Sequence, residues 1–555
     1  MSFNNFKRIN IFNLFSFSCI FLSVLLVENV SGLTRLDPLV DTNVGLIRGL
    51  LAEDGDYAMF LGIPYGVVNG SNPFGAAITQ PNFATTFEAY DDSAVCPQIF
   101  QSTIRGTLDC LHLNIYVPSS ASSQNPLPVM IWIHGGSFMH GFSGRTLYGP
   151  KFLVKHNVVL VTVNYRVGAY GFMCLDIPSV PGNQGLKDQL LALKWIKENI
   201  GSFGGDSNKI TLFGESAGGH SVDFHLISPK DKLYDQVILQ SGSVYAATVL
   251  YEPDKNAPIK MAEYLGYKTD DLQQALEYLA MTNSDSVIDS VINTGILFKP
   301  CVEKDHPDAF IIRSWLQKNL HVPKVNGMPV LLGFNENELM FSHINRDESH
   351  FSNIDIIRKY LDRIFIFNEG ELEEMKEIIQ HFYFGGEDIT QNLEWSVVDF
   401  DSDFTYIHPI QRTLKNYLEN NAGNTFYYMF SYAGERNYYK KFIFNFTSLP
   451  GASHADELGY LFDSEILSQV SNDEDLLIVE RMTKMWTNFA KTGDPTPDTS
   501  DPLLPIKWLP VTKKTYNYLN INTEMKLERR PLSKRMAFWD IFYELNEHLQ
   551  RGFVH

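Results

Sequence analysis

The sequence predicts an α/β protein with a mostly parallel central sheet that helices cover on both faces. Five short runs, rich in β-branched residues, are almost continuously apolar, as expected of strands buried on both sides; they are residues 129–133, 158–163, 210–213, 237–239 and 330–332. Between the second and third runs, residues 186–200 have apolar side chains at helical spacing, and a second helix is expected from Ala217 onward. Strands and helices that alternate in this way indicate a parallel sheet.

Composition and charge indicate how the chain is organised and which partners it excludes. Of the 555 residues, 44% are hydrophobic and 20% charged, which is typical of a globular chain. No linker rich in Pro, Gly or Ser divides residues 33–555, so we expect a single domain with large insertions. Segments 255–295 and 346–395 look helical and amphipathic, and we expect them to cap the C-terminal edge of the sheet. The formal charge of −19, without long Lys/Arg runs, argues against a nucleic-acid partner.

The N-terminus predicts secretion. Two basic residues precede an apolar run at 11–27, and small residues follow, so residues 1–32 are predicted to be a signal peptide cleaved after Gly32. A signal anchor is the alternative interpretation. No later segment reaches the roughly 18 to 20 apolar residues of a membrane helix, which predicts an extracellular protein without a membrane span. Sequons at Asn69 and Asn445 are candidate glycosylation sites.

Cysteine use fits an oxidising compartment. After Cys19 leaves with the signal peptide, four cysteines remain. Cys96 and Cys110 close a short loop and are the most plausible disulfide. Cys174 and Cys301 are either a second bridge or two buried thiols, and we favour the thiols slightly because free buried cysteines are common.

The strongest chemical signal is the segment Gly214-Glu-Ser-Ala-Gly218, which lies between an apolar strand and a helix. This is the G-x-S-x-G nucleophile elbow in the context that an α/β-hydrolase fold requires, with Ser216 as the nucleophile. The glycines leave room for a tight turn that presents the serine hydroxyl at the top of the sheet. A purely structural strand-to-helix turn is the alternative.

A second loop supplies the donors that acyl transfer needs for its developing oxyanion. The segment His134-Gly-Gly-Ser-Phe138 follows the first predicted strand. We expect the backbone N–H groups of Gly136, Ser137 and Ala217 to form the oxyanion hole. An ordinary glycine-rich turn is the alternative.

Many ordered motifs, spread over nearly all of the mature sequence, resemble type-B carboxylesterases, the family that includes the cholinesterases. They include Phe60-Leu-Gly-Ile-Pro-Tyr65, Asp109-Cys-Leu-His-Leu-Asn114, Asn164-Tyr-Arg-Val-Gly168, Gly182-Asn-Gln-Gly-Leu-Lys-Asp-Gln189, Gln240-Ser-Gly-Ser243 and Trp486-Thr-Asn-Phe-Ala-Lys-Thr-Gly493. The segment Arg535-Met-Ala-Phe-Trp539 most resembles insect carboxylesterases, including antennal esterases. The resemblance implies the α/β-hydrolase fold and carboxylic-ester hydrolysis.

The resemblance also implies the rest of the catalytic triad. The family's acid lies in a Gly-x-Asn-x-x-Glu segment, here residues 333–338, which gives Glu338, with Glu336 as the fallback. The histidine lies in the matching segment 451–462, which gives His454. The order Ser216, Glu338, His454 is the one that the fold requires. No metal or cofactor is implied.

Two further residues are expected beside the triad, and one ion pair of the family is expected to be kept. Ser241 and Glu215 are placed next to the catalytic groups, where Glu215 is expected to stabilise positive charge near His454. Juvenile-hormone esterases usually have Gln at the position of Glu215, which makes that substrate a weaker expectation. Arg166 and Asp188, on matching motifs, are expected to pair and to stabilise the structure.

Departures from the family pattern concern the substrate. The Cys96–Cys110 region lacks the tryptophan with which cholinesterases bind a quaternary ammonium, which disfavours choline esters. Family alignment places the acyl pocket at Thr248, Thr294 and Ile296, where cholinesterases have bulky aromatics, so a roomier pocket is expected. The oxyanion loop has Ser137 where glycine or alanine is common, but its N–H is retained.

The sequence therefore predicts a secreted hydrolase of small to medium apolar esters of the pheromone, hormone or xenobiotic type. Its predicted partner is a small-molecule ester. One alternative is a catalytically weak adhesion or binding protein, like the neuroligins, which resemble this family. Lipase action is a third interpretation, which esters of increasing chain length would separate from the first.

Overall fold

The computed structural model describes residues 38–551, apart from 305, 313–319, 354, 443–448, 468, 471 and 499. The predicted signal peptide and the sequon asparagine Asn445 lie outside these residues. Within them, no helix has both the length and the apolar composition that a membrane span requires.

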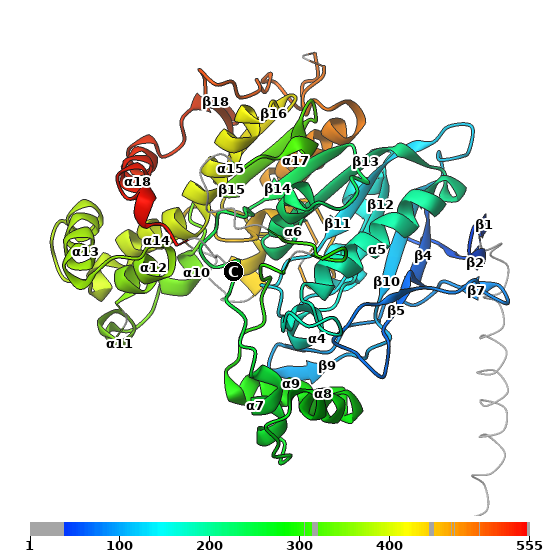
Figure 1. The fold of residues 1–555 in the computed structure, drawn as a ribbon. Helices are drawn as coiled ribbons and strands as arrows, with labels where there is room; N and C mark the ends of the chain where they lie inside the picture. The colour runs from blue at the N-terminus through cyan, green and yellow to red at the C-terminus, as the bar shows by residue number, and fades with distance from the viewer. Residues whose placement is uncertain are drawn as a thin grey trace, which may run out of the picture.

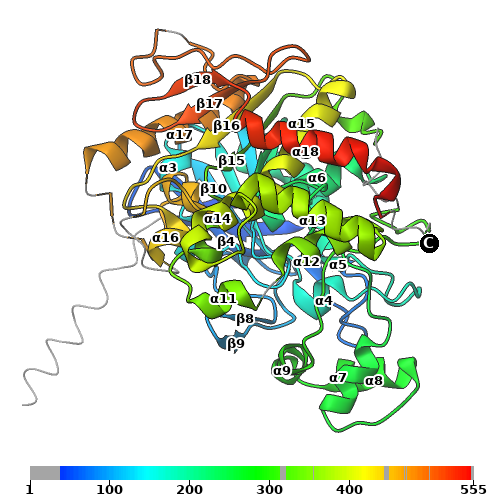
Figure 2. The same ribbon diagram turned by 90° about the vertical axis from the view of Figure 1, so that its left-hand side faces the viewer.

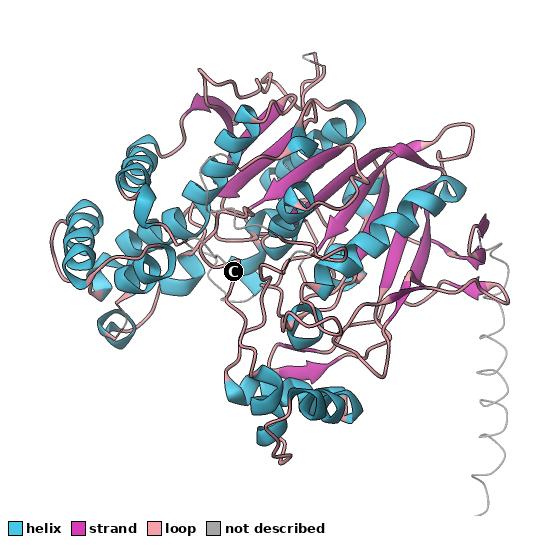
Figure 3. Ribbon diagram, in the orientation of Figure 1, coloured by secondary structure: helices cyan, strands magenta, loops and turns pink. Residues whose placement is uncertain are grey.

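The central sheet of the described chain has eleven strands, in the order β18-β17-β16-β15-β14-β13-β11-β12-β10-β4-β3 (Figures 1 and 3). Seven neighbouring strands are parallel: β12 (Val159–Val163), β11 (Leu127–Ile133), β13 (Gly205–Glu215), β14 (Gln236–Gln240), β15 (Val330–Asn335), β16 (Thr425–Phe430) and β17 (Asn517–Ile521). Antiparallel strands complete the two edges: β18 (Lys526–Arg529), β10 (His112–Pro118), β4 (Tyr57–Pro64) and β3 (Leu50–Leu51). The five predicted strands all lie in the parallel part, which confirms the fold class.

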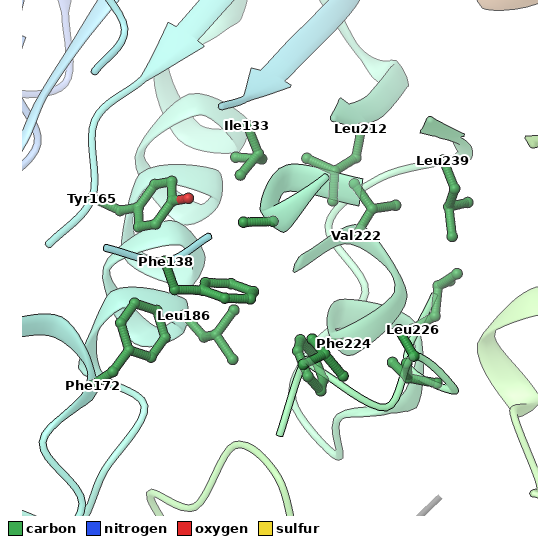
Figure 4. Close-up of a cluster of buried hydrophobic side chains, with 14 of the residues drawn as sticks. Ile133, Phe138, Tyr165, Phe172, Leu186, Leu212, Val222, Phe224, Leu226 and Leu239 are labelled. Atoms are coloured by element: carbon green, nitrogen blue, oxygen red, sulfur yellow. The ribbon is translucent and has the colours of Figure 1, made fainter. Parts of the chain in front are cut away.

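Side chains of the strands alternate between two hydrophobic clusters, one on each face of the sheet. In β11, Ile131 and Ile133 belong to one cluster and Met130 and Trp132 to the other. The first cluster also contains apolar side chains of the helices α5 (Gln184–Asn199), α6 (Ala217–Ile227) and α15 (His408–Glu419). Figure 4 shows part of this cluster. The second includes α3 (Lys151–Val154) and α17 (Asp473–Thr492). Because both faces of the sheet are buried, the sequences of the central strands are continuous apolar runs.

The two predicted insertions are helical. The first contains α7 (Ala257–Tyr264), α8 (Leu272–Met281) and α9 (Ser284–Thr294), and it lies beside the hairpin of β8 (Gln98–Phe100) and β9 (Thr103–Arg105) (Figures 1 and 2). The second contains α11 (Glu348–Ser352), α12 (Ile356–Ile364), α13 (Glu369–Phe384) and α14 (Glu394–Ser402). A π-helical turn, η4 (Asp403–Ile407), joins α14 to α15. The C-terminal helix α18 (Ser533–Leu545) lies near this second group (Figure 1).

Shorter strands and helices lie outside the central sheet and the two insertions. Near its N-terminus are β1 (Leu39–Thr42), β2 (Gly45–Arg48) and β7 (Phe87–Glu88), which form a separate sheet, and the pair β5 (Gly66–Val67) and β6 (Ile78–Thr79). The remaining α-helices have four or five residues each: α2 (Arg145–Tyr148), α4 (Gly168–Phe172), α10 (Met340–His343) and α16 (Tyr438–Phe442).

Two disulfides cross-link the chain. The predicted Cys96–Cys110 bond is present. Cys174 and Cys301 are also bonded to each other, so our preference for two buried thiols was wrong. The fold brings together two cysteines that are 127 positions apart, and Gly182 makes room for them: a Cβ at this glycine would lie 2.6 Å and 2.8 Å from the two sulfur atoms.

Candidate active site

Ser216 lies at the turn between β13 and α6, in a backbone conformation that an L-residue rarely adopts. Its φ is 54° and its ψ is −122°. The glycines on either side are required by close backbone contacts, since a Cβ on Gly218 would lie 1.9 Å from the carbonyl oxygen of Ile133, and a Cβ on Gly214 would lie 2.5 Å from the carbonyl carbon of Gly218. The turn therefore presents the serine at the end of the sheet, with the N-terminus of α6 behind it.

His454 is hydrogen-bonded to Glu338, which follows β15. The His454 Nδ1 lies 2.6 Å from the Glu338 Oε2. The other carboxylate oxygen, Oε1, accepts hydrogen bonds from the Ser241 hydroxyl at 2.6 Å and from the Asn335 N–H at 2.8 Å. Of the two candidate acids, it is thus Glu338 and not Glu336 that is bonded to the imidazole, and Ser241 holds it in place.

Two more buried carboxylates lie near the imidazole. The Oε1 of Glu215 is 3.1 Å from the His454 Nε2, and it accepts no hydrogen bond within the described chain. The contact is an ion pair when His454 is protonated. Glu457 accepts hydrogen bonds from Gln240 and Asn335, at 2.9 Å and 2.6 Å. In the described part of the chain, these and other His, Cys, Asp and Glu side chains form no group of three placed to hold a metal ion.

Burial and charge change the proton affinity of this cluster. Burial raises the pKa of Glu215, the nearby Glu457 and Glu338 carboxylates raise it further, and the positive charge of His454 opposes them. Burial by itself lowers the pKa of His454, but Glu215 and the hydrogen-bonded Glu338 outweigh it, so that this pKa is raised. The cluster therefore holds a proton to a higher pH than isolated side chains would.

The loop at residues 134–138 runs directly along the serine. A Cβ on Gly135 would lie 2.8 Å from the Glu215 Oε2 and 3.2 Å from the Ser216 Cβ. The next three residues all have positive φ: 111° at Gly136, 57° at Ser137 and 62° at Phe138. Among the described residues, no acceptor is paired with the backbone N–H groups of Gly136, Ser137 or Ala217. These groups can therefore donate to a bound oxyanion.

A cavity of about 560 Å³ opens onto these groups. Ser216, Glu215 and His454 lie on its wall together with Gly136 and Ser137. Much of the remaining wall is aromatic and comes from distant segments: Phe100, Tyr148, Phe341, Tyr406, Tyr438 and Tyr439. The cavity thus combines a polar, catalytic wall with an aromatic one.

The aromatic wall was not predicted from the sequence. Phe341 had one available signal, since it follows Glu338 by three residues and so lies near the same site. Tyr406 lies on the π-helical turn η4, with its ring centroid 4.6 Å from that of His454, and no local pattern marks it. Tyr438 and Tyr439 begin the short helix α16 and likewise carry no such pattern.

The residues predicted for the acyl pocket are not among those that line this cavity. The hydroxyl of Thr294 donates instead to the carbonyl oxygen of Ser290 in its own helix, at 2.6 Å. Thr248 and Ile296 are both half-buried and also lie off the cavity wall. The assignment of Thr248, Thr294 and Ile296 to acyl binding stays a prediction.

Comparison with known proteins gives consistent matches over most of the chain. The family model described as the carboxylesterase family matches residues 36–539. The juvenile hormone esterase of Tribolium castaneum is 30% identical over an alignment of 565 positions, gaps included, which covers 92% of this chain and 95% of that protein. The bile salt-activated lipase of Homo sapiens is 30% identical over 524 residues, which cover 89% of this chain and 67% of that protein. A solved structure, juvenile hormone esterase from Manduca sexta with OTFP covalently attached, superposes with a TM-score of 0.79 at 25% identity and covers 92% of this chain and 100% of its own.

Proposed function

The chain belongs to the carboxylesterase family and is a carboxylic-ester hydrolase, and we propose that it acts through Ser216 as nucleophile, His454 as general base and Glu338 as the acid that orients the base. One observation carries this proposal: an imidazole bonded to a buried carboxylate shares a cavity wall with a serine held in a strained elbow. The separate loop at 134–138 adds the N–H groups of Gly136 and Ser137 to the same wall, and no acceptor in the described part of the chain is bonded to them.

The reaction follows from these positions. His454 takes the proton of the Ser216 hydroxyl as its oxygen attacks the ester carbonyl carbon, and Glu338 holds the ring and stabilises the imidazolium. The N–H groups of Gly136, Ser137 and Ala217 donate to the oxyanion. His454 then protonates the departing alcohol, which leaves an acyl-enzyme on Ser216. Water, deprotonated by the same histidine, attacks this ester and releases the carboxylic acid.

Small to medium apolar esters suit this site best. The aromatic wall offers apolar contact area, and a cavity of about 560 Å³ accommodates an ester of that size. The names of two relatives, juvenile hormone esterase and bile salt-activated lipase, are compatible with apolar substrates. We include hormone, pheromone and xenobiotic esters in this class.

We also propose that the protein is secreted and glycosylated. Two disulfides support an oxidising compartment, because such bonds are rare in the cytosol. Of the two sequons, Asn69 is exposed, and its side-chain oxygen accepts hydrogen bonds from the N–H and the hydroxyl of Ser71. Exposure makes this asparagine accessible to glycosylation.

The test is hydrolysis of p-nitrophenyl acetate, butyrate and octanoate by the purified protein and by Ser216→Ala. We expect the variant to lose at least about 10³-fold in kcat/KM, because the nucleophile is gone. The exposed Ser352→Ala is the matched control and should retain full activity. A Ser216→Ala variant as active as the wild type would reject the proposed triad, and the chain-length profile would define the preferred acyl group.

A further inference from the structure

The oxyanion loop has a strained backbone that must be held in place from outside. Two of its residues, Ser137 and Phe138, adopt positive φ without being glycine. The Phe138 side chain is buried against Phe172, with ring centroids 5.0 Å apart, and Figure 4 shows it within the cluster that also contains Tyr165. The Tyr165 hydroxyl donates to the carbonyl oxygen of His134 at 2.8 Å. Packing therefore fixes the two ends of the loop.

Backbone hydrogen bonds hold the carbonyl groups on either side of Ser137. The carbonyl oxygen of Gly136 accepts from the N–H groups of Met139 and His140, at 2.9 Å and 3.1 Å. The carbonyl oxygen of Phe138 accepts from the N–H of Gly168 at 2.7 Å. These bonds leave the orientation of the peptide between Ser137 and Phe138 to another partner.

That partner is Lys299, from a segment 162 positions further along the chain. Its Nζ donates to the carbonyl oxygen of Ser137 at 2.7 Å. A hydrogen bond from an ammonium group is stronger than one between neutral groups, so it can hold an exposed carbonyl that packing does not reach. Ser137 itself is exposed and lies on the cavity wall.

The segment that carries Lys299 is itself tied to the fold. Two residues later, Cys301 is bonded to Cys174, and its N–H donates to the Asn183 side-chain oxygen at 3.0 Å. The carbonyl oxygen of Pro300 accepts from the N–H of Tyr251 at 3.2 Å. The ammonium group therefore extends from a backbone that is fixed on the C-terminal side of Lys299.

We propose that Lys299 is a positioning residue for the oxyanion hole. By holding the Ser137 carbonyl, it keeps the adjacent N–H groups of Gly136 and Ser137 directed at the oxygen that becomes negative during acyl transfer. This inference rests on the proposed function. It predicts an effect on the transition state more than on substrate binding, because the oxyanion forms only after attack.

The experiment compares Lys299→Met with Lys299→Arg in hydrolysis of p-nitrophenyl butyrate. We expect Lys299→Met to lower kcat about 10- to 100-fold, with KM changed less than about twofold, since losing one oxyanion donor outright costs about 10²- to 10³-fold. Affinity for a trifluoromethyl ketone, whose adduct with serine also forms an oxyanion, should fall by the same factor. Lys299→Arg retains a charged donor and should keep most of the activity.

The control is Lys260→Met on α7, which removes an exposed ion pair with Asp254 and should behave as the wild type. If Lys299→Met keeps wild-type kcat and ketone affinity, the positioning role is overturned, while the proposed function stands on the Ser216→Ala result. An inactive wild type would instead reject the proposed function itself.

A pH profile tests the role even if Lys299→Met does not fold. Burial lowers the pKa of Lys299 to about 8, and the charge of Arg363 also lowers it. The charge of Lys299 also acts on His140 and His220. Burial lowers the pKa of both histidines, so they stay neutral above pH 7. Arginine remains charged, so the ratio of kcat for Lys299→Arg to kcat for the wild type should rise as pH increases through about 8. A constant ratio between pH 7 and 9.5 would contradict the proposal.

Discussion

His454 lies among three buried carboxylates, and they determine the pH at which it can act as a base. Only its neutral form can accept the serine proton. Glu215 and Glu338 raise the pKa of the ring, so the neutral form is reached at a higher pH than for an isolated histidine. Glu215 is the less essential of the two for geometry, because Glu338 already makes the hydrogen bond to Nδ1.

Glu215→Gln should therefore move the acidic limb of the pH profile of kcat/KM to lower pH. Removing the negative charge lowers the pKa of His454, so the neutral base persists to a lower pH than in the wild type. The measurement is kcat/KM for p-nitrophenyl butyrate between pH 5 and 9. Glu373→Gln, on the exposed surface of α13, is the control and should leave the profile unchanged. A shift of the Glu215→Gln limb to higher pH would contradict this account.

At the scale of elements, a buried ion pair joins the segment after β12 to helix α5. The guanidinium of Arg166 donates to both carboxylate oxygens of Asp188, each at 2.7 Å, and the two side chains are 0% and 1% exposed. The same guanidinium also donates to the carbonyl oxygens of Pro73 and Gly75. The pair expected from the sequence is thus present and also holds a loop.

Asp188→Asn should lower the free energy of unfolding by about 3–5 kcal/mol, because it leaves a buried guanidinium without its counter-charge. Urea denaturation followed by tryptophan fluorescence would measure the change. Asp362→Asn, which removes an exposed partner of Arg358 on α12, should cost less than about 1 kcal/mol. Equal shifts for the two variants would mean that the buried pair has no special role.

The sequence predicts the central elements better than the edges or the cavity. Strands β11 to β15 are buried on both faces and so appear as apolar runs in the sequence. The edge strand β18, Lys-Leu-Glu-Arg, is mostly polar, so no apolar run marks it as a strand. The elbow at Ser216 is a local motif and could be predicted from its own neighbours. The choice between Glu336 and Glu338 depended on which carboxylate turns inward after β15, which only the folded chain determines. The aromatic wall is assembled from separate segments without a shared sequence pattern.

At the scale of the whole molecule, the two disulfides restrict the unfolded chain to different extents. Cys96 and Cys110 are separated by 14 positions, whereas Cys174 and Cys301 are separated by 127. A longer closed loop removes more conformational entropy from the unfolded state. The Cys174–Cys301 bond, which the sequence left open, should therefore contribute more stability than the predicted Cys96–Cys110 bond.

Replacing both cysteines of a pair by serine measures each contribution without leaving a free thiol. The chain-entropy relation gives about 3 kcal/mol for the short loop and about 5 kcal/mol for the long one, so Cys174→Ser/Cys301→Ser should unfold at a lower urea concentration than Cys96→Ser/Cys110→Ser. The wild type under the same conditions supplies the reference midpoint. Because the long-range bond also anchors the segment before it, its loss should lower kcat through Lys299 in urea-free buffer. If the short-loop variant proved the less stable of the two, strain or residual structure would outweigh loop length in this chain.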